Sequence, residues 1–80
     1  MMIMAFAYTM IKTIIDKDNK IYDELLKIKE IIELHPLFGE FNYIAKVEAM
    51  DYNSLGEIII DKIRAIHGVV DTQTLTGVKF

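Results

Sequence analysis

Histidines are the first residues to consider for chemistry in this sequence, and there are two, His35 and His67. Neither has a carboxylate or a second histidine at the spacing of helical metal ligands. A zinc site needs three or four converging ligands, and cysteine, another common zinc ligand, is absent. The sequence therefore predicts no metal site. Both histidines are expected to be partly exposed, one on a strand and one at a helix end.

The sequence also shows no residues arranged for acid–base catalysis or phosphate transfer. The acidic pairs Asp23–Glu24 and Glu30–Glu33 fall on a predicted helix or at its end, where charged side chains are usually solvated. The sequence contains no serine-centred elbow, no glycine-rich phosphate loop and no Walker motif. These observations predict a protein that is not an enzyme and that uses no cofactor.

Four aromatic residues could form a binding platform. Phe6 and Tyr8 lie on the first predicted strand, and Phe41 and Tyr43 lie on the third. An RNA recognition motif stacks bases on aromatic residues of the two central strands. The charge argues against this function, because the residue before Gly39 is Phe instead of a basic residue and the net charge is −3. Packing in the core or in a dimer interface is the preferred interpretation.

Composition places the chain among small globular domains. It has 80 residues, of which 52% are hydrophobic and 26% charged. A domain of this size buries only a thin core and usually needs added stabilisation, which disulfides cannot supply because cysteine is absent. The acidic balance and the single arginine, Arg64, predict no direct nucleic-acid partner.

The apolar opening segment, residues 1–11, raises the question of a membrane or targeting role. It is shorter than the roughly 20 apolar residues of a spanning helix. It also lacks the basic start and the small-residue cleavage site of a secretory signal. We therefore expect a cytoplasmic protein with no membrane partner.

Hydrophobic periodicity predicts strand, helix, strand, strand, helix, strand in one domain, residues 1–80. The strands are expected at 3–14, 32–38, 41–49 and 69–80, the first of them buried on both faces. Pro36 cannot donate a ladder hydrogen bond, so the second strand should lie at an edge or carry a bulge. The last strand places a set of alternating residues on one face, namely Val70, Thr72, Thr74, Thr76, Val78 and Phe80.

Two helices are expected between these strands. The first should begin after an N-cap at Asp18 or Asn19, and its apolar stripe consists of Ile21, Leu25, Ile28 and Ile32. The second should begin with a capping box and end at a C′ glycine. The residues concerned are Ser54 and Glu57 at the start and Gly68 at the end.

This order of elements predicts the ferredoxin-like βαββαβ sandwich, an α+β fold with a four-stranded antiparallel sheet and both helices on one face. The strands nevertheless carry apolar side chains on both faces. A soluble monomer rarely leaves an apolar patch of that size exposed. Symmetric dimers are the commonest oligomers, so we expect a homodimer that covers the second face.

A family resemblance is carried by the turn Gly39-Glu40-Phe41-Asn42, the alternating strand after it, and the closing segment Gly68-Val69-x-x-Thr72-x-Thr74. Ile31 and Glu33 fit upstream positions of the same pattern. In this order and spacing, the sequence resembles the effector-binding (RAM) domain of the Lrp/AsnC transcription regulators. The resemblance covers essentially the whole chain.

The resemblance implies homodimers of the dimeric α/β barrel type that assemble into a closed ring. It further implies that an amino acid or a related small metabolite binds between dimers. One wall of that site would be Gly39, Glu40, Phe41 and Asn42, and a second wall would be Thr72 and Thr74. Gly39 allows close backbone approach, Glu40 could meet an ammonium group, and threonine hydroxyls could serve a carboxylate.

Two departures from the family pattern shape the expected function. Asn42 stands where the family usually has Asp, which weakens charge pairing with a ligand ammonium. The N-terminal helix-turn-helix domain is missing, so the chain resembles a stand-alone sensor that modulates transcription without binding DNA. Full-length Lrp/AsnC regulators are further expected partners.

Other function classes stay open at this point. Small dimeric ferredoxin-like enzymes share the predicted fold, although this is an analogy of fold alone. The loop after the first strand, residues 16–19, lacks the arginine that acylphosphatase-like chemistry would need. An RNA-binding module of the recognition-motif type and a purely structural partner of full-length regulators are the remaining alternatives.

Overall fold

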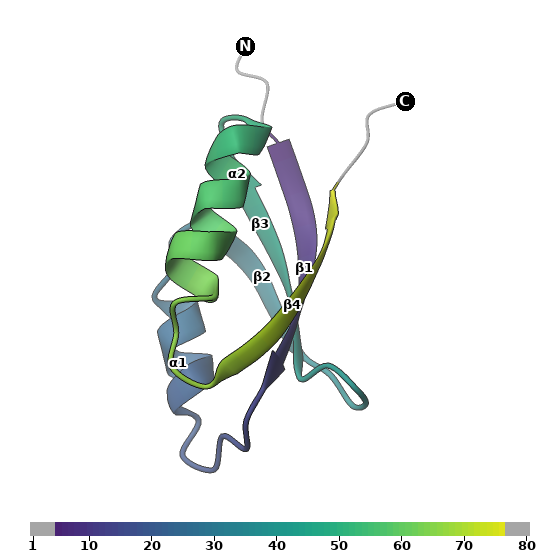
Figure 1. The fold of residues 1–80 in the computed structure, drawn as a ribbon, viewed down its shortest axis with the longest axis vertical. Coiled ribbons are helices and arrows are strands. Elements are labelled where there is room, and N and C mark those ends of the chain that lie inside the picture. The colour runs from purple at the N-terminus through teal and green to yellow at the C-terminus, as the bar shows by residue number, and fades with distance from the viewer. Residues whose placement is uncertain (1–4, 77–80) are drawn as a thin grey trace.

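The computed structural model describes residues 5–76, which form four strands and two helical segments. The strands are β1 (Ala5–Thr13), β2 (Ile31–Pro36), β3 (Tyr43–Ala49) and β4 (Val69–Thr76). The helices are α1 (Lys20–Leu26) and α2 (Tyr52–Ile58), and α2 runs directly into a π-helical turn, η1 (Ile59–Ile63). The antiparallel sheet has the order β2-β3-β1-β4, and both helices cover the same face (Figure 1). The predicted ferredoxin-like fold is confirmed.

Strand β1 lies inside the sheet because it pairs with β3 on one side and with β4 on the other. Its residues that face the helices begin with the small side chains Ala5, Ala7 and Thr9, all of them buried. These short side chains allow α2 to pack closely over β1 and β3. The core is completed by larger residues, chiefly Ile11, Ile21, Leu25, Tyr43, Val47, Leu55, Ile59 and Ile63.

No helix of residues 5–76 lies over the opposite face of the sheet (Figure 1). We call it the open sheet face, and it carries Phe6, Tyr8, Met10 and Lys12 from β1, Ile44, Lys46 and Glu48 from β3, and Gln73 and Leu75 from β4. These side chains are half-buried or exposed within one chain. The expectation that β1 is buried on both faces is therefore wrong for the single chain, because two short helices can cover only one side of four strands.

Strand β2 forms one edge of the sheet, as Pro36 predicts. Pro36 pairs with Tyr43 of β3, and the register shifts between Ile31 and Glu33. An edge position and an irregular register are the two ways in which a strand accommodates proline. The expected first and last strands extend past the described residues, so Ile3, Val78 and Phe80 lie outside them.

Helix α1 is shorter than its apolar stripe predicts. It ends at Leu26, and Ile32 lies in β2 with 48% of its surface exposed. The helical spacing of apolar residues extends beyond the end of α1 to Ile28 and Ile32, and of these two only Ile28 packs against the core. The predicted helical periodicity is thus correct for Ile21 and Leu25 and wrong for Ile32.

The start of α1 is capped by a side chain several residues earlier in the sequence. The carboxylate of Asp16 accepts hydrogen bonds from the backbone N–H groups of Ile21 and Tyr22, at 3.1 Å each. Asn19 occupies the N-cap position in a left-handed conformation, with a φ of 56°, and its side chain makes no capping bond. The prediction of a side-chain cap at Asp18 or Asn19 is therefore wrong, and Asp16 performs that role.

The start of the second helix also differs from the prediction. Asp51 is the N-cap of α2, and its carboxylate accepts a 2.7 Å hydrogen bond from the backbone N–H of Ser54. The Asp51 side chain supplies the required acceptor three residues earlier than the predicted cap. Ser54 is consequently inside the helix, so the capping box with Glu57 is wrong.

The turn that follows the second helical segment requires glycine at position 68. Helical geometry stops at Ile63, and Gly68 lies five residues further on, in the turn before β4, with a φ of 101°. A Cβ atom at Gly68 would lie 2.6 Å from Cδ1 of Ile21 and 3.1 Å from Cγ1 of Ile14. Gly68 is therefore required by its backbone conformation and by close packing, and its predicted role as a C′ cap is wrong.

Gly68→Ala is expected to lower the free energy of unfolding by about 1 to 3 kcal/mol, because alanine is strained at a positive φ and its Cβ would contact Ile21. Gly56→Ala is the matched control, since Gly56 lies in α2 and no atom lies within 4 Å of the place that its Cβ would take. This control should gain about 0.5 to 1 kcal/mol from helix propensity. Urea unfolding of both variants tests the contrast, and equal midpoints would contradict it.

Candidate functional site

The turn between β2 and β3 is fastened to the sheet by Asn42. Leu37 N–H donates to the carbonyl of Asn42 at 2.8 Å, and Asn42 N–H donates to the carbonyl of Ile11 at 2.8 Å. The side-chain oxygen of Asn42 accepts a 2.9 Å hydrogen bond from the backbone N–H of Thr13. These three bonds tie both ends of the turn to each other and to the end of β1, so Asn42 has a structural role in addition to any binding role.

The tip of the turn projects away from the sheet (Figure 1). Gly39 has a φ of 143°, and no atom lies within 4 Å of the place where its Cβ would be. Phe38 is fully exposed, Glu40 is exposed, and Phe41 is half-buried. The turn therefore presents a bare backbone, a carboxylate and an aromatic ring to the surroundings, on a base that is held in place by Asn42.

Thr72 and Thr74 do not meet this turn within one chain. They lie on β4, on the far side of β1, where they pair with Ile11 and Thr9. The Thr74 hydroxyl lies 3.4 Å from the hydroxyl of Thr9, on the face of the sheet that the helices cover. Thr74 also lines a hollow of about 260 Å³ between β4 and α2. A site with both predicted walls would need a contribution from a second chain.

A polar contact below α1 links the sheet to the first helix. Burial opposes ionisation of Asp16, but hydrogen bonds from the Ile21 and Tyr22 N–H groups and from the Tyr43 hydroxyl outweigh it and hold the pKa of this carboxyl below its usual value. Burial and the adjacent Asp16 charge raise the pKa of the Tyr43 hydroxyl. The Asp16 carboxylate and the Tyr43 hydroxyl thus stabilise the fold. The position of Asp16 shortly before the helix is the sequence signal that could have identified it as the cap.

The aromatic residues do not form one platform. Tyr43 is buried on the helix side of the sheet and packs against Tyr22 at 5.9 Å between ring centroids. Phe41 precedes β3 instead of lying on it. Phe6 and Tyr8 do share the open sheet face, where their rings meet edge to face at 6.0 Å. The four-residue constellation of an RNA recognition motif is therefore absent from the described residues.

A cation lies over the two rings of the open sheet face. The Lys46 ammonium is 5.0 Å from the centroid of Phe6 and 5.9 Å from that of Tyr8. Such cation–π contacts keep a lysine flat against an aromatic surface instead of extended into solvent. This part of the open sheet face therefore consists of two aromatic rings with a cation lying against them.

Both histidines are exposed. His35 lies on β2 with Nε2 3.4 Å from a carboxylate oxygen of Glu33, and His67 lies in the turn before β4. Within residues 5–76, no group of three or more histidines, cysteines or carboxylates is arranged to hold a metal ion. Across the same residues, none of the helices has the length and apolar character required to cross a bilayer.

Comparison with known proteins identifies the family. The sequence model of the Lrp/AsnC ligand binding domain matches residues 7–79, so the chain belongs to that family. An uncharacterised HTH-type transcriptional regulator of Pyrococcus abyssi is 38% identical over 59 residues, which are 74% of this chain and 39% of the regulator. The chain thus spans well under half the length of this relative, and the predicted recognition of the Lrp/AsnC ligand-binding domain is confirmed.

Solved structures share the fold. The crystal structure of FFRP-DM1 superimposes with a TM-score of 0.86 and 27% identity, over 92% of this chain and 99% of that one. Escherichia coli AsnC gives a TM-score of 0.86 at 22% identity, over 95% of this chain and 52% of its own. The Neisseria meningitidis regulator NMB0573, solved with L-methionine, gives 0.77 at 22% identity, over 94% of this chain and 50% of its own.

Asn42→Ala is expected to lower the free energy of unfolding by about 1 kcal/mol, because the Thr13 N–H loses its acceptor. Asn42→Asp keeps an acceptor oxygen at the same place and should retain the stability. Asn53→Ala, at an exposed position of α2, is the matched control and should be nearly neutral. Urea unfolding checks the series. An Asn42→Ala midpoint equal to that of the wild type would show that the Thr13 bond contributes nothing.

Proposed function

We propose that this chain is a small-molecule sensing and assembly module of Lrp/AsnC type, and that it binds an amino acid at the turn 39–42. The observation that carries the proposal is the contrast within this turn. Its base is fixed by three hydrogen bonds at Asn42, while Gly39 and Glu40 remain exposed and uncovered by other groups of the described chain. A site that is rigid before binding loses little conformational entropy on binding.

The chemistry of the turn suits the two ends of an amino acid. The Glu40 carboxylate can pair with the ligand ammonium, and backbone N–H groups beside Gly39 can approach the ligand carboxylate without obstruction by a Cβ. Asn42 offers hydrogen bonds but no charge, so the ammonium would depend on Glu40. L-methionine is bound in the solved NMB0573 complex, which makes it a first ligand to test.

The second wall of the site would come from another chain. Thr72 and Thr74 lie across β1 from the turn of their own chain, so a neighbouring subunit would have to bring its own β4 to this turn. Exposed apolar side chains at this end of the sheet favour such a contact. Phe38 is fully exposed, and Ile15, just beyond β1, is 82% exposed. Association of dimers into a ring through this end would bury them.

A homodimer through the open sheet face is the other part of the proposal. Met10 and Ile44 are cross-strand neighbours at its centre and are only half-buried in the single chain. An apolar sheet face of this kind is stabilised when a second sheet packs on it. Full-length HTH-type relatives carry the same domain, so the same face could join this chain to them and let it modulate transcription without its own DNA contact.

The direct test of sensing is a thermal-shift screen of the twenty amino acids, followed by isothermal titration of the best ligand. A ligand at 100 times its dissociation constant should add about 2.7 kcal/mol of stability. Glu40→Gln should weaken binding roughly twofold to fivefold and Asn42→Asp should strengthen it by a similar factor, as expected for exposed ion pairs.

Glu57→Gln removes the same charge from an exposed position of α2 and serves as the matched control. It should leave the affinity unchanged. If both turn variants bind as the wild type does, the turn is not the site. If none of the amino acids stabilises the protein, the sensing role itself fails.

The dimer is tested separately by sedimentation of the wild type, which should have twice the mass of one chain. Ile44→Glu places a charge at the centre of the open sheet face and should yield monomers, because removing a carboxylate from water opposes association. Ile60→Glu is the matched control on the helical side, where Ile60 is 62% exposed, and should stay dimeric. A folded wild-type monomer at micromolar concentration would overturn the proposed interface.

A further inference from the structure

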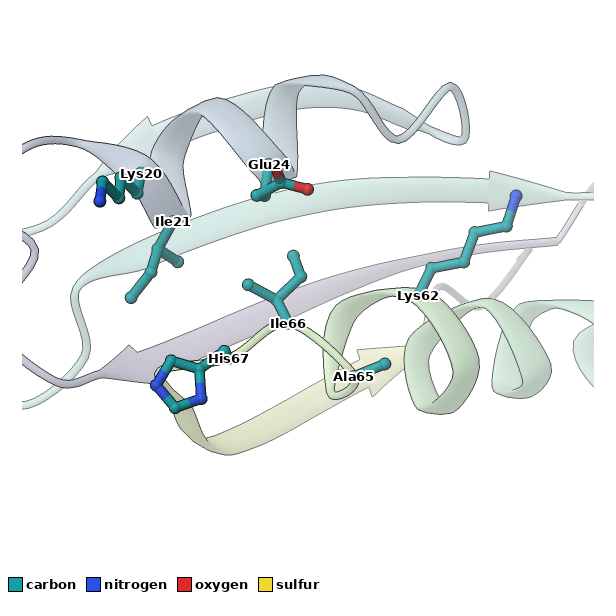
Figure 2. A pocket seen from close by; sticks show the side chains of 7 residues that line it. All are labelled: Lys20, Ile21, Glu24, Lys62, Ala65, Ile66 and His67. Atoms are coloured by element: carbon teal, nitrogen blue, oxygen red, sulfur yellow. The ribbon is translucent and has the colours of Figure 1, made fainter.

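A hollow lies between the two helical segments, on the side of the molecule away from the open sheet face. It is open to solvent and has a volume of about 550 Å³. One wall comes from α1 and the other from the end of η1 and the turn after it (Figure 2). Its lining includes Lys20, Ile21 and Glu24 on one wall and Lys62, Ile66 and His67 on the other. The floor is apolar, and the polar groups stand at the rim.

A second hollow of about 280 Å³ adjoins the first and shares Lys20, Ile21 and His67 with it. It adds Ile14, Ile15, Asp16, Lys17 and Asp18 from the segment between β1 and α1, and the Asp16 carboxylate there accepts hydrogen bonds from the backbone N–H groups of Ile21 and Tyr22. The two hollows therefore form one trough that passes over Ile21. We call it the inter-helical trough, and its middle is the place where Lys20 and His67 stand on either side.

The charged groups of the trough differ in whether they already have partners. Lys62 donates to Glu30 at 2.8 Å and 2.9 Å, and Glu24 is paired with Lys27 at 3.1 Å. Among the described residues, no acidic side chain lies within ion-pair distance of Lys20, and the His67 ring makes no hydrogen bond. The uncommitted polar groups of the larger hollow are thus an ammonium and an imidazole.

Figure 2 shows these two groups at the same end of the hollow, whereas Lys62 points away at the other end. The backbone that carries these two side chains is held in two ways. His67 precedes Gly68, whose backbone approaches Ile21 so closely that no side chain fits between them. Lys20 begins α1, and the residue after it is held at its N–H by Asp16. The backbone on the two sides of Ile21 is therefore held by the close packing of Gly68 against Ile21 and by the Asp16 cap of α1.

We propose that the inter-helical trough binds a small organic anion with an apolar body, independently of the turn 39–42. The anionic head, a carboxylate or a phosphate, lies between Lys20 and His67, where it accepts hydrogen bonds from both. The aliphatic body lies along Ile21 and Ile66. Such a ligand matches both halves of the trough, because a bare anion would leave the apolar floor wet and a neutral alkane would leave the cation unpaired.

Nuclear magnetic resonance titrations with three six-carbon probes test the site on the intact protein. Hexanoate and hexyl phosphate should shift the backbone amide signals of residues 20–24 and 64–68, and the tighter of the two identifies the preferred head group. Hexylamine, which has the same body and the opposite charge, should not shift them. Equal shifts by hexylamine, or shifts confined to residues of the sheet, would overturn the proposal.

Removal of the two polar groups provides the second arm. Lys20→Gln should weaken hexanoate binding roughly threefold to fivefold, in the range of exposed ion pairs, and His67→Ala, which removes a hydrogen-bond donor, should weaken it as well. Lys12→Gln removes the same charge from β1 on the other face of the sheet and should leave the affinity unchanged. Equal affinity in the Lys20 and Lys12 variants would overturn the site.

The two sites can fail separately. An amino acid that titrates at the turn should not compete with hexanoate, and Glu40→Gln should not alter hexanoate binding. Competition between the two ligands would mean that the probe occupies the turn, and it would overturn the trough as a distinct site.

Discussion

The structure depends on the position of β1 between β3 and β4. Residues 5–76 of this 80-residue chain form two short helical segments to cover a four-stranded sheet. They cover one face, and the small side chains of Ala5, Ala7 and Thr9 on β1 let them approach it closely. All other features follow from this choice, because the same strand presents Phe6 and Tyr8 on the face that remains uncovered. An apolar face in a protein with so thin a core is a reason to associate.

Short polar side chains connect the elements where the sheet ends. Asp16 joins the end of β1 to α1 and to Tyr43, and Asn42 joins the turn between β2 and β3 to Thr13. Each acceptor satisfies a backbone N–H that secondary structure leaves unpaired, which buried or half-buried backbone requires. The base of the turn that carries Glu40 and the start of the helix that carries Lys20 are consequently bonded to the rest of the fold.

Charges of both signs line the trough between the helical segments. Three lysines, Lys17, Lys20 and Lys62, and three carboxylates, Asp16, Asp18 and Glu24, lie along it, while Glu40 is exposed at the tip of the turn. Where a lysine of the trough has a partner, the pair also braces the fold: the hydrogen bond from Lys62 lowers the pKa of Glu30 and ties η1 to the segment before β2. The side chains of Lys20 and His67 make no ion pair or hydrogen bond within the described residues, so both are available to a ligand.

The sequence by itself determined the fold class, the element order, the edge position of the strand with Pro36 and the family, because alternation, helical period and turn spacing are local properties of the chain. Several predictions from the sequence were wrong. Ile32 continues the apolar stripe of the helix but lies in β2, Ser54 resembles an N-cap but Asp51 caps α2, and Gly68 resembles a C′ glycine but lies in the turn before β4. Only the tertiary structure decided that Asn42 bonds to Thr13, that Thr74 lies across β1 from the turn, and that Lys20 and His67 line the same hollow. Those relations join residues distant in sequence, and their geometry is set by strand register and helix packing, which no local pattern contains.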